Sequence, residues 1–262
     1  MDISVIIPTY KPREYLWECL ASLVKQTFPK KDFEVVLVLN GCTEPWRGEI
    51  ENYIATKMCG MNINFIHTGK AGVSNARNVA LSVARGKFVA FIDDDDYVSP
   101  SYLEELYQNS SLDTIGLCYP YAFRDGDLQQ LPYSITDIYN KLSKKGIQPY
   151  PRARKYFSGP CMKLIPMSFI QDRRFNVNFR NGEDSLFMFC ISDKFGSVAF
   201  TSESAVYYRR YRANSAVTSK RTIICRLHNK LNLFKEYLKI YWGAPTKYNF
   251  CFFLTRVLAL LR

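Results

Sequence analysis

The sequence predicts an α/β fold in which a mostly parallel central sheet is covered by helices on both faces. Three observations carry this prediction. The 262-residue chain is long enough for one large domain around a substantial core. Its first hundred residues alternate between short apolar runs and helical patterns. Two of those runs, Ile3 to Ile7 and Glu34 to Leu39, lack the polar–apolar alternation of half-exposed strands, and strands buried on both faces are typical of parallel sheets under helices.

The first elements follow a strand–helix rhythm. Pro8 ends the first strand. Pro12 suits the first turn of a helix, and the apolar side chains at positions 16, 20, 23 and 24 fall on one face of that helix. The second strand ends at Asn40 and Gly41.

The next elements place acidic residues at the end of a buried strand. A weaker strand is expected over residues 62–66 and a helix over 72–85. A fourth strand over 87–92 runs directly into four aspartates, residues 93–96. Because ligands of parallel sheets bind at the carboxyl ends of the strands, Asn40 and the aspartates are expected at the ligand-binding edge.

Beyond residue 112 the pattern becomes irregular. A helix is expected after residues 181–184, and strands are expected over 198–201 and 205–208. After Arg221 the sequence predicts an amphipathic helix. Its apolar stripe consists of Ile224, Leu227, Leu231, Phe234, Leu238 and Tyr241.

Composition narrows the function classes. Apolar residues make up 47% and charged residues 23% of the chain, which excludes a disordered protein. No two of the eight cysteines are closer than seventeen residues, which argues against a zinc site. With no secretory signal, we expect reduced thiols in the cytoplasm. Only two histidines are present, so a metal would have to be held by oxygen ligands.

Positive charge is concentrated at the end of the chain. The net charge is +11, and +7 of it falls after residue 220, where eight Lys and Arg accompany one acidic residue, Glu236. The apolar run Phe250 to Leu261 has twelve residues, fewer than the ~20 that span a bilayer. A basic amphipathic tail of this kind predicts contact with lipid headgroups or nucleic acid. The alternative is that the tail packs back on the domain.

The four consecutive aspartates point to a metal. Carboxylates this close raise each other's pKa, and a divalent cation relieves the repulsion. The alternative is that they cap the helix that Ser99 and Pro100 begin. One aspartate would serve as a cap, whereas four after an apolar strand favour a metal site.

Several segments together resemble the family-2 glycosyltransferases with the GT-A fold. The specific ones are SVIIPTY at residues 4–10, GVSNARN at 72–78 and GKFVAFIDDDD at 86–96. Weaker similarities are GED at 182–184, CMKL at 161–164 and YRRYRANS at 208–215. The resemblance implies a Rossmann-like GT-A sheet with flanking helices, to which this chain adds C-terminal amphipathic helices.

The resemblance also implies roles for individual residues. The residues that would bind the donor nucleotide are Pro8, Thr9, Tyr10, Asn40, Arg77, Asp93 and Asp94. Asp95 would hold Mg²⁺ or Mn²⁺, and Asp184 would be the catalytic base. The candidate contacts to the acceptor or the diphosphate are Glu183, Lys163, Arg209 and Arg212.

The chemistry of sugar transfer agrees with these roles. A divalent cation neutralises the charge that grows on a leaving diphosphate. Inversion takes one in-line displacement, so a single carboxylate suffices to remove the acceptor's proton. From the residues alone, Glu183 and Asp184 fit a helix cap equally well, and Arg77 fits an ordinary charge on a helix face.

Asn40 departs from the family pattern, which commonly has an aspartate that reads uracil. An asparagine can accept the uracil proton and can also donate, so a UDP-sugar is expected while other bases stay open. The lost aspartate is also the one sign of an inactive homologue. The chain contains no Gln-x-x-Arg-Trp sequence and no spanning segment, which favours addition of a single sugar over processive synthesis.

We therefore predict a metal-dependent inverting glycosyltransferase that acts on a glycan or lipid-linked glycan in cell-surface polysaccharide or glycolipid synthesis, in the cytoplasm at the inner face of a membrane. Residues 1–115 would bind the nucleotide sugar and metal, 116–220 the acceptor, and 221–262 form the basic tail. One rival is a nucleotidyltransferase, although residues 8–14 contain no glycine-rich loop. The other is a basic nucleic-acid-binding protein, which the aspartate run disfavours, and we expect no nucleic-acid partner.

Overall fold

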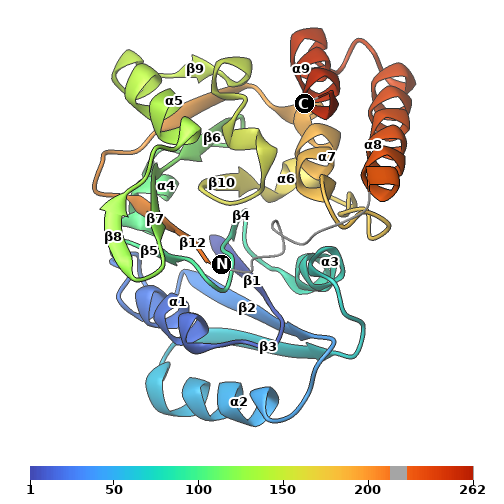
Figure 1. The fold of residues 1–262 in the computed structure, drawn as a ribbon. Coiled ribbons are helices and arrows are strands. Elements are labelled where there is room, and N and C mark those ends of the chain that lie inside the picture. Colours follow the sequence, from blue (N-terminus) through green and yellow to red (C-terminus); the bar gives the residue numbers. More distant parts are fainter. Residues whose placement is uncertain (213–222, 262) are drawn as a thin grey trace.

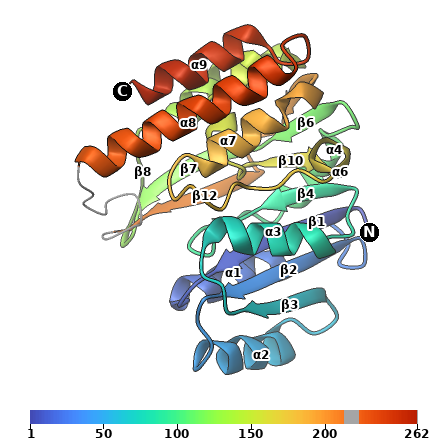
Figure 2. The same ribbon diagram turned by 90° about the vertical axis from the view of Figure 1, so that its right-hand side faces the viewer.

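The computed structural model describes residues 1–212 and 223–261 and has the expected α/β architecture (Figure 1). The elements of the first part are β1 (Ile3–Thr9), α1 (Glu14–Val24), β2 (Phe33–Asn40), α2 (Trp46–Lys57), β3 (Asn62–Thr68), α3 (Val73–Val83) and β4 (Phe88–Phe91). The four strands are parallel, and every residue of β1 and β2 is buried. Helices α1 and α3 lie on opposite sides of these strands (Figure 2), which explains the unbroken apolar runs.

The second part extends the same sheet. Its elements are β5 (Tyr97–Val98), α4 (Tyr102–Gln108), β6 (Thr114–Leu117), β7 (Tyr119–Arg124), β8 (Asp127–Gln130), α5 (Ser134–Leu142), β9 (Gln148–Pro149), β10 (Lys163–Pro166), α6 (Met167–Ile170), α7 (Glu183–Cys190), β11 (Ser197–Phe200) and β12 (Val206–Tyr211). The eight-stranded order is β3-β2-β1-β4-β10-β6-β11-β9, with β10 antiparallel to β4 and β6. Strand β6 crosses the boundary predicted at residue 115, so the two predicted halves share one sheet.

A smaller sheet brings β12, the last strand before residue 213, close to the aspartates. Its order is β5-β12-β7-β8. Strand β12 pairs with β5, which directly follows the aspartate run, through Tyr208 opposite Tyr97. This pairing carries the arginines at positions 209, 210 and 212 to the ligand-binding edge. Residues 213–215 of the predicted YRRYRANS similarity lie outside the described residues.

The basic tail forms two helices, α8 (Ile223–Gly243) and α9 (Phe250–Leu260), which lie side by side and cover α7 (Figures 1 and 2). No helix of the described residues is long and apolar enough to cross a membrane. The side chains that α8 buries are Leu233, Tyr237 and Tyr241, and those that α9 buries are Phe252, Phe253 and Arg256.

The predicted apolar stripe of α8 is wrong in part. Leu227 and Leu231 are 55% and 58% exposed, whereas Leu233, outside the stripe, is 3% exposed. The reason is that α8 packs on the domain through Leu233, Tyr237 and Tyr241, and of these three only Tyr241 belongs to the predicted stripe. The side chain of Ile224 lies outside the described part of the chain.

Candidate active site

The carboxyl ends of β1 and β2 form one wall of the site. Thr9, the last residue of β1, donates from Oγ1 to Asp94 Oδ2 at 2.6 Å. Asn40, the last residue of β2, donates from Nδ2 to the Thr9 carbonyl oxygen at 2.6 Å and accepts the Gly72 N–H on Oδ1 at 2.8 Å. An ionised aspartate could not donate to Thr9, so the asparagine holds β1 to the start of α3. Pro8 is buried, and Tyr10 is 50% exposed at the edge of the site.

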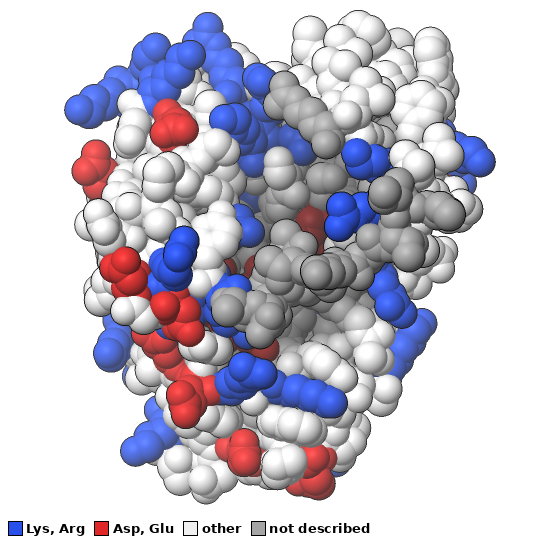
Figure 3. All heavy atoms as spheres, viewed as in Figure 1, with Lys and Arg blue, Asp and Glu red and all other residues white. Residues whose placement is uncertain are grey.

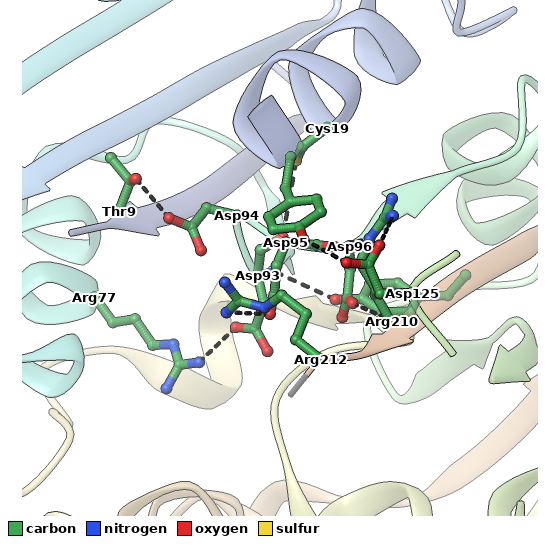
Figure 4. A network of polar contacts seen from close by, with 12 residues as sticks. Thr9, Cys19, Arg77, Asp93, Asp94, Asp95, Asp96, Asp125, Arg210 and Arg212 are labelled. Atoms are coloured by element: carbon green, nitrogen blue, oxygen red, sulfur yellow. Dashed lines mark hydrogen bonds and ion pairs between the residues drawn. The ribbon is translucent and has the colours of Figure 1, made fainter. Parts of the chain in front are cut away.

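The four aspartates divide into two groups (Figure 4). Asp94 turns toward Thr9, whereas carboxylate oxygens of Asp93, Asp95 and Asp96 lie within 4.8 Å of one another. A turn brings the first and fourth aspartates together, because the Asp96 N–H donates to the Asp93 carbonyl oxygen at 3.1 Å. Three carboxylates form the hard oxygen set that Mg²⁺ and Mn²⁺ prefer, so the residues present fit such an ion.

Burial makes this cluster costly without a cation. Desolvation raises the pKa of Asp95, and desolvation together with the charges of Asp95 and Asp93 raises the pKa of Asp96. Desolvation also raises the pKa of Asp94 to about 7, against the opposing hydrogen bond from Thr9. A divalent cation would favour the ionised form of these carboxylates.

The pairing of β12 with β5 brings two arginines into contact with the same carboxylates. Arg212 Nη2 lies 2.5 Å from Asp95 Oδ2. The backbone N–H of Arg210 donates to Asp96 Oδ1 at 2.8 Å, and its guanidinium pairs with Glu18 and Asp125. A cation at Asp95 would therefore share or displace the ion pair with Arg212.

Arg77 joins the aspartate run to Asp184. It lies on α3 and is 2% exposed. Its Nη2 donates to Asp93 Oδ1 at 2.9 Å, and its Nη1 donates to Asp184 Oδ1 at 2.6 Å. Burial acts to lower the pKa of Arg77, but the carboxylates of Asp184 and Asp93 raise it above its ordinary value. Burial raises the pKa of Asp184, against the opposing charge of Arg77.

Helix α8 fixes the start of α7, where Asp184 lies. Gly182 has a φ of +84°, which favours glycine, and a Cβ at this position would lie 2.5 Å from Leu233 Cδ1, so α8 packs closely on the start of α7. The hydroxyls of Ser185 and Tyr237 lie 2.7 Å apart. The tail therefore positions Asp184 as well as covering α7.

Of the predicted contacts to acceptor or diphosphate, Arg209 lines a pocket of about 270 Å³, together with Asp93 and Asp184. Arg209 Nη1 donates to the Tyr133 hydroxyl at 2.7 Å. Lys163 is buried and is not one of the described residues that line this pocket. Its Nζ donates to the carbonyl oxygens of Gly159 and Cys161, at 2.6 Å each. Both of these residues belong to the loop that lines the pocket. Burial lowers the pKa of Lys163 to about 8. Glu183 is buried at the first position of α7 and is not among the described residues that line the pocket.

Sequence reasoning includes Asp96 in the acidic run but assigns it no role of its own, and it misses Tyr133 as a site residue. Four polar residues after a strand are a turn signal, and a turn over 93–96 would have placed the fourth aspartate beside the first. No comparable signal exists for Tyr133, because its neighbour Arg209 is 76 positions away in the sequence.

Comparison with known proteins assigns the family. Residues 4–174 match the sequence model of the family described as glycosyl transferase family 2. The chain belongs to this family. The match includes Arg77 and the aspartate run, whereas Asp184 and β12 lie beyond it.

Two relatives of this family-2 protein illustrate the range of similarity. The poly(ribitol-phosphate) β-N-acetylglucosaminyltransferase TarS of Staphylococcus aureus is 40% identical over 105 residues, which are 40% of this chain and 18% of TarS. The glycosyltransferase GlyG of Streptococcus pneumoniae is 29% identical over 217 residues, covering 79% of this chain and 70% of GlyG. The chain thus spans only a small part of the length of TarS.

Solved structures confirm the GT-A fold. The crystal structure of S. aureus TarS 1–349 in complex with UDP-GlcNAc has a TM-score of 0.70 at 25% identity, covering 91% of this chain and 67% of that chain. A mannosyltransferase from Pyrobaculum calidifontis in complex with GDP-Man and Mn²⁺ has a TM-score of 0.60 at 16% identity, covering 99% of this chain and 73% of that chain. The second likeness concerns the fold alone.

Proposed function

We propose that this family-2 glycosyltransferase moves a single sugar from a UDP-sugar to an acceptor hydroxyl with inversion, and that Mg²⁺ or Mn²⁺ binds at Asp93, Asp95 and Asp96. The observation that carries the proposal is the link through Arg77 between the converging carboxylates and Asp184. TarS structures with UDP and UDP-GlcNAc support a uridine nucleotide. The names of TarS and of the minor teichoic acid biosynthesis protein GgaB of Bacillus subtilis support a role in cell-surface polysaccharide synthesis. The nucleotidyltransferase and nucleic-acid-binding alternatives have no support in this family assignment.

We assign to Asp184 the removal of the acceptor's proton. Its Oδ1 accepts from Arg77, while its Oδ2 faces the pocket loop, where a Cβ on Gly159 would lie 4.0 Å away. As the acceptor oxygen attacks the anomeric carbon, its proton passes to Oδ2, and the bond from that carbon to the diphosphate oxygen breaks on the opposite side. Because burial raises the pKa of Asp184, the carboxylate is a stronger base than an exposed aspartate.

The donor would lie against the ends of β1 and β2. Tyr10 is exposed there and can stack on the base, and Asn40 shapes the backbone that surrounds it. Arg77 and Arg212 place positive charge beside the carboxylates, where the diphosphate would approach. A bound divalent cation would neutralise the charge that develops on the leaving diphosphate.

The proposal is tested by Asp184→Asn. Removal of a general base lowers turnover on the order of 10²- to 10⁴-fold, and we expect that loss in UDP release from UDP-GlcNAc with a polyol-phosphate polymer as acceptor. UDP affinity, measured by calorimetry in Mn²⁺, should stay nearly unchanged. Asp172→Asn is the matched control, because Asp172 is exposed. Near-normal turnover of Asp184→Asn would assign Asp184 to helix capping and remove the base from the mechanism.

We also propose that the tail rests on an anionic lipid surface. The large apolar side chains that α8, α9 and their flanks expose are Leu227, Leu231, Phe234, Trp242, Phe250, Leu254, Leu258 and Leu261. On the face that Figure 3 shows, the region of α8 and α9 at the upper right carries few charged side chains. The exposed or half-buried basic residues beside them are Arg226, Lys230, Lys235, Lys239 and Lys247. Apolar side chains would enter the interface while the basic ones contact phosphate headgroups, which suits a lipid-linked acceptor.

A further inference from the structure

A second pocket, of about 420 Å³, adjoins the one that contains Asp184. Four residues line both pockets: Tyr133, Ile135, Ser158 and Arg209. The far wall of the second pocket is α9, through Thr255, Arg256 and Leu258. A molecule with its reacting hydroxyl at Asp184 would therefore extend past Arg209 toward α9.

The second pocket is cationic. Arg154, Lys155, Arg209 and Arg256 line it, and within residues 1–212 and 223–261 no Asp or Glu does. None of these four side chains forms an ion pair with a carboxylate of the same described residues. Figure 3 shows Lys and Arg gathered on the surface between α5 and α9. The positive charge of this pocket is therefore not neutralised by carboxylates of the described residues.

Arg256 gives the strongest indication of a ligand. It interrupts the apolar helix α9 and is 6% exposed. Its Nη1 donates to Ser158 Oγ at 3.2 Å and its Nη2 to the Arg154 carbonyl oxygen at 2.6 Å, while its Nε has no partner in the described part of the chain. Burial lowers the pKa of this guanidinium. A buried cation with neutral partners alone is costly, and an anion from solution would offset that cost.

We propose that this pocket binds an oxyanion carried by the acceptor, so that the enzyme selects acidic acceptors such as a polyol phosphodiester or an acidic glycan. Guanidinium groups bind phosphate and carboxylate through paired hydrogen bonds, and a lysine adds a point charge. The inference rests on the proposed function, because the oxyanion belongs to the molecule whose hydroxyl faces Asp184. The shared wall at Arg209 keeps the oxyanion and the reacting hydroxyl on one molecule.

The test measures binding of three probes by calorimetry, with UDP and Mn²⁺ present: a glycerol phosphodiester oligomer, an oligouronic acid of equal length and a neutral oligosaccharide. The pocket variant is Arg154→Gln/Lys155→Gln, whose side chains are exposed or half-buried. The matched control is Lys144→Gln/Lys145→Gln, which removes the same charge from exposed positions outside the pocket. Melting temperature confirms that both variants fold.

We expect the unmodified enzyme to bind one of the anionic oligomers at least about tenfold more tightly than the neutral one, because charge-assisted hydrogen bonds are the strong ones. The pocket variant should lose about tenfold in that affinity, and the control variant should not. The oligomer that binds identifies the oxyanion as phosphate or carboxylate.

Three results would overturn the inference. The first is that the unmodified enzyme binds the neutral oligomer as tightly as the anionic ones. The second is that the pocket variant and the control variant lose affinity equally, and the third is that the pocket variant loses only its binding to anionic vesicles. The last would assign the pocket to a lipid headgroup. UDP affinity is read separately. If the unmodified enzyme does not bind UDP, the proposed function fails, and the preference for an anionic oligomer is still measured.

Discussion

Replacing Arg77 by methionine tests whether this one guanidinium holds the two sides of the site together. The Arg77 side chain is 3% exposed, and those of its partners Asp93 and Asp184 are 43% and 30% exposed. Removing one partner of a buried ion pair costs about 3–5 kcal/mol, because a charge is left uncompensated. Since both carboxylates retain access to water, we expect the lower end of that range, about 3 kcal/mol.

Urea denaturation measures the loss directly as a lower transition midpoint. For a chain of this size 1 kcal/mol corresponds to about 2–4 °C in melting temperature, so the variant should melt about 6–12 °C below the unmodified protein. Arg47→Met is the control, because Arg47 pairs with Glu51 on an exposed helix face, where water screens the ion pair and its loss has little effect on stability. Adding Asp184→Asn to Arg77→Met should recover at least about 0.5 kcal/mol, since the uncompensated carboxylate is then gone. If Arg77→Met costs no more than Arg47→Met, the bridge has no energetic role and the reasoning is refuted.

Three further predictions concern the metal, the tail and the packing against α7. Asp95→Asn should remove most of the Mn²⁺-dependent part of UDP affinity, measured by calorimetry with and without Mn²⁺; equal affinity in both proteins would exclude Asp95 as a ligand. Trp242→Glu/Leu258→Glu should abolish sedimentation with anionic vesicles at low salt, because charged side chains resist entry into the interface. The control is Leu128→Glu on β8, where the leucine is 71% exposed, and this variant should sediment with the vesicles normally. Leu233→Ala should lower the free energy of unfolding by about 2–5 kcal/mol, because it leaves a cavity against Gly182; a loss below about 1 kcal/mol would place the side chain in solvent.

The elements that the sequence predicts are those whose signals are local. Unbroken apolar runs are sufficient to place β1 and β2, and the structure confirms both strands. The end predicted at Pro8 is wrong, because β1 continues through Pro8, which pairs with Val38, to Thr9. Helix α2 was not predicted because it buries one residue, Ile50, and so has no apolar stripe. The stripe of α8 is predicted wrongly in part, because which of its side chains are buried depends on how the helix packs on α7.

The chemistry of the site divides in the same way. The aspartate run is a local feature, and the cost of packing like charges together made it predictable as a cation site from residue order alone. The partners of these aspartates come from distant parts of the chain: Arg77 meets Asp184 across 107 positions, and Arg212 reaches Asp95 because β12 pairs with β5. Periodicity and propensity contain no information about such meetings, since these depend on which strands pair and on which helix covers them. The cationic pocket is lined by separate residues between positions 133 and 259, so for the same reason no local sequence pattern predicts it.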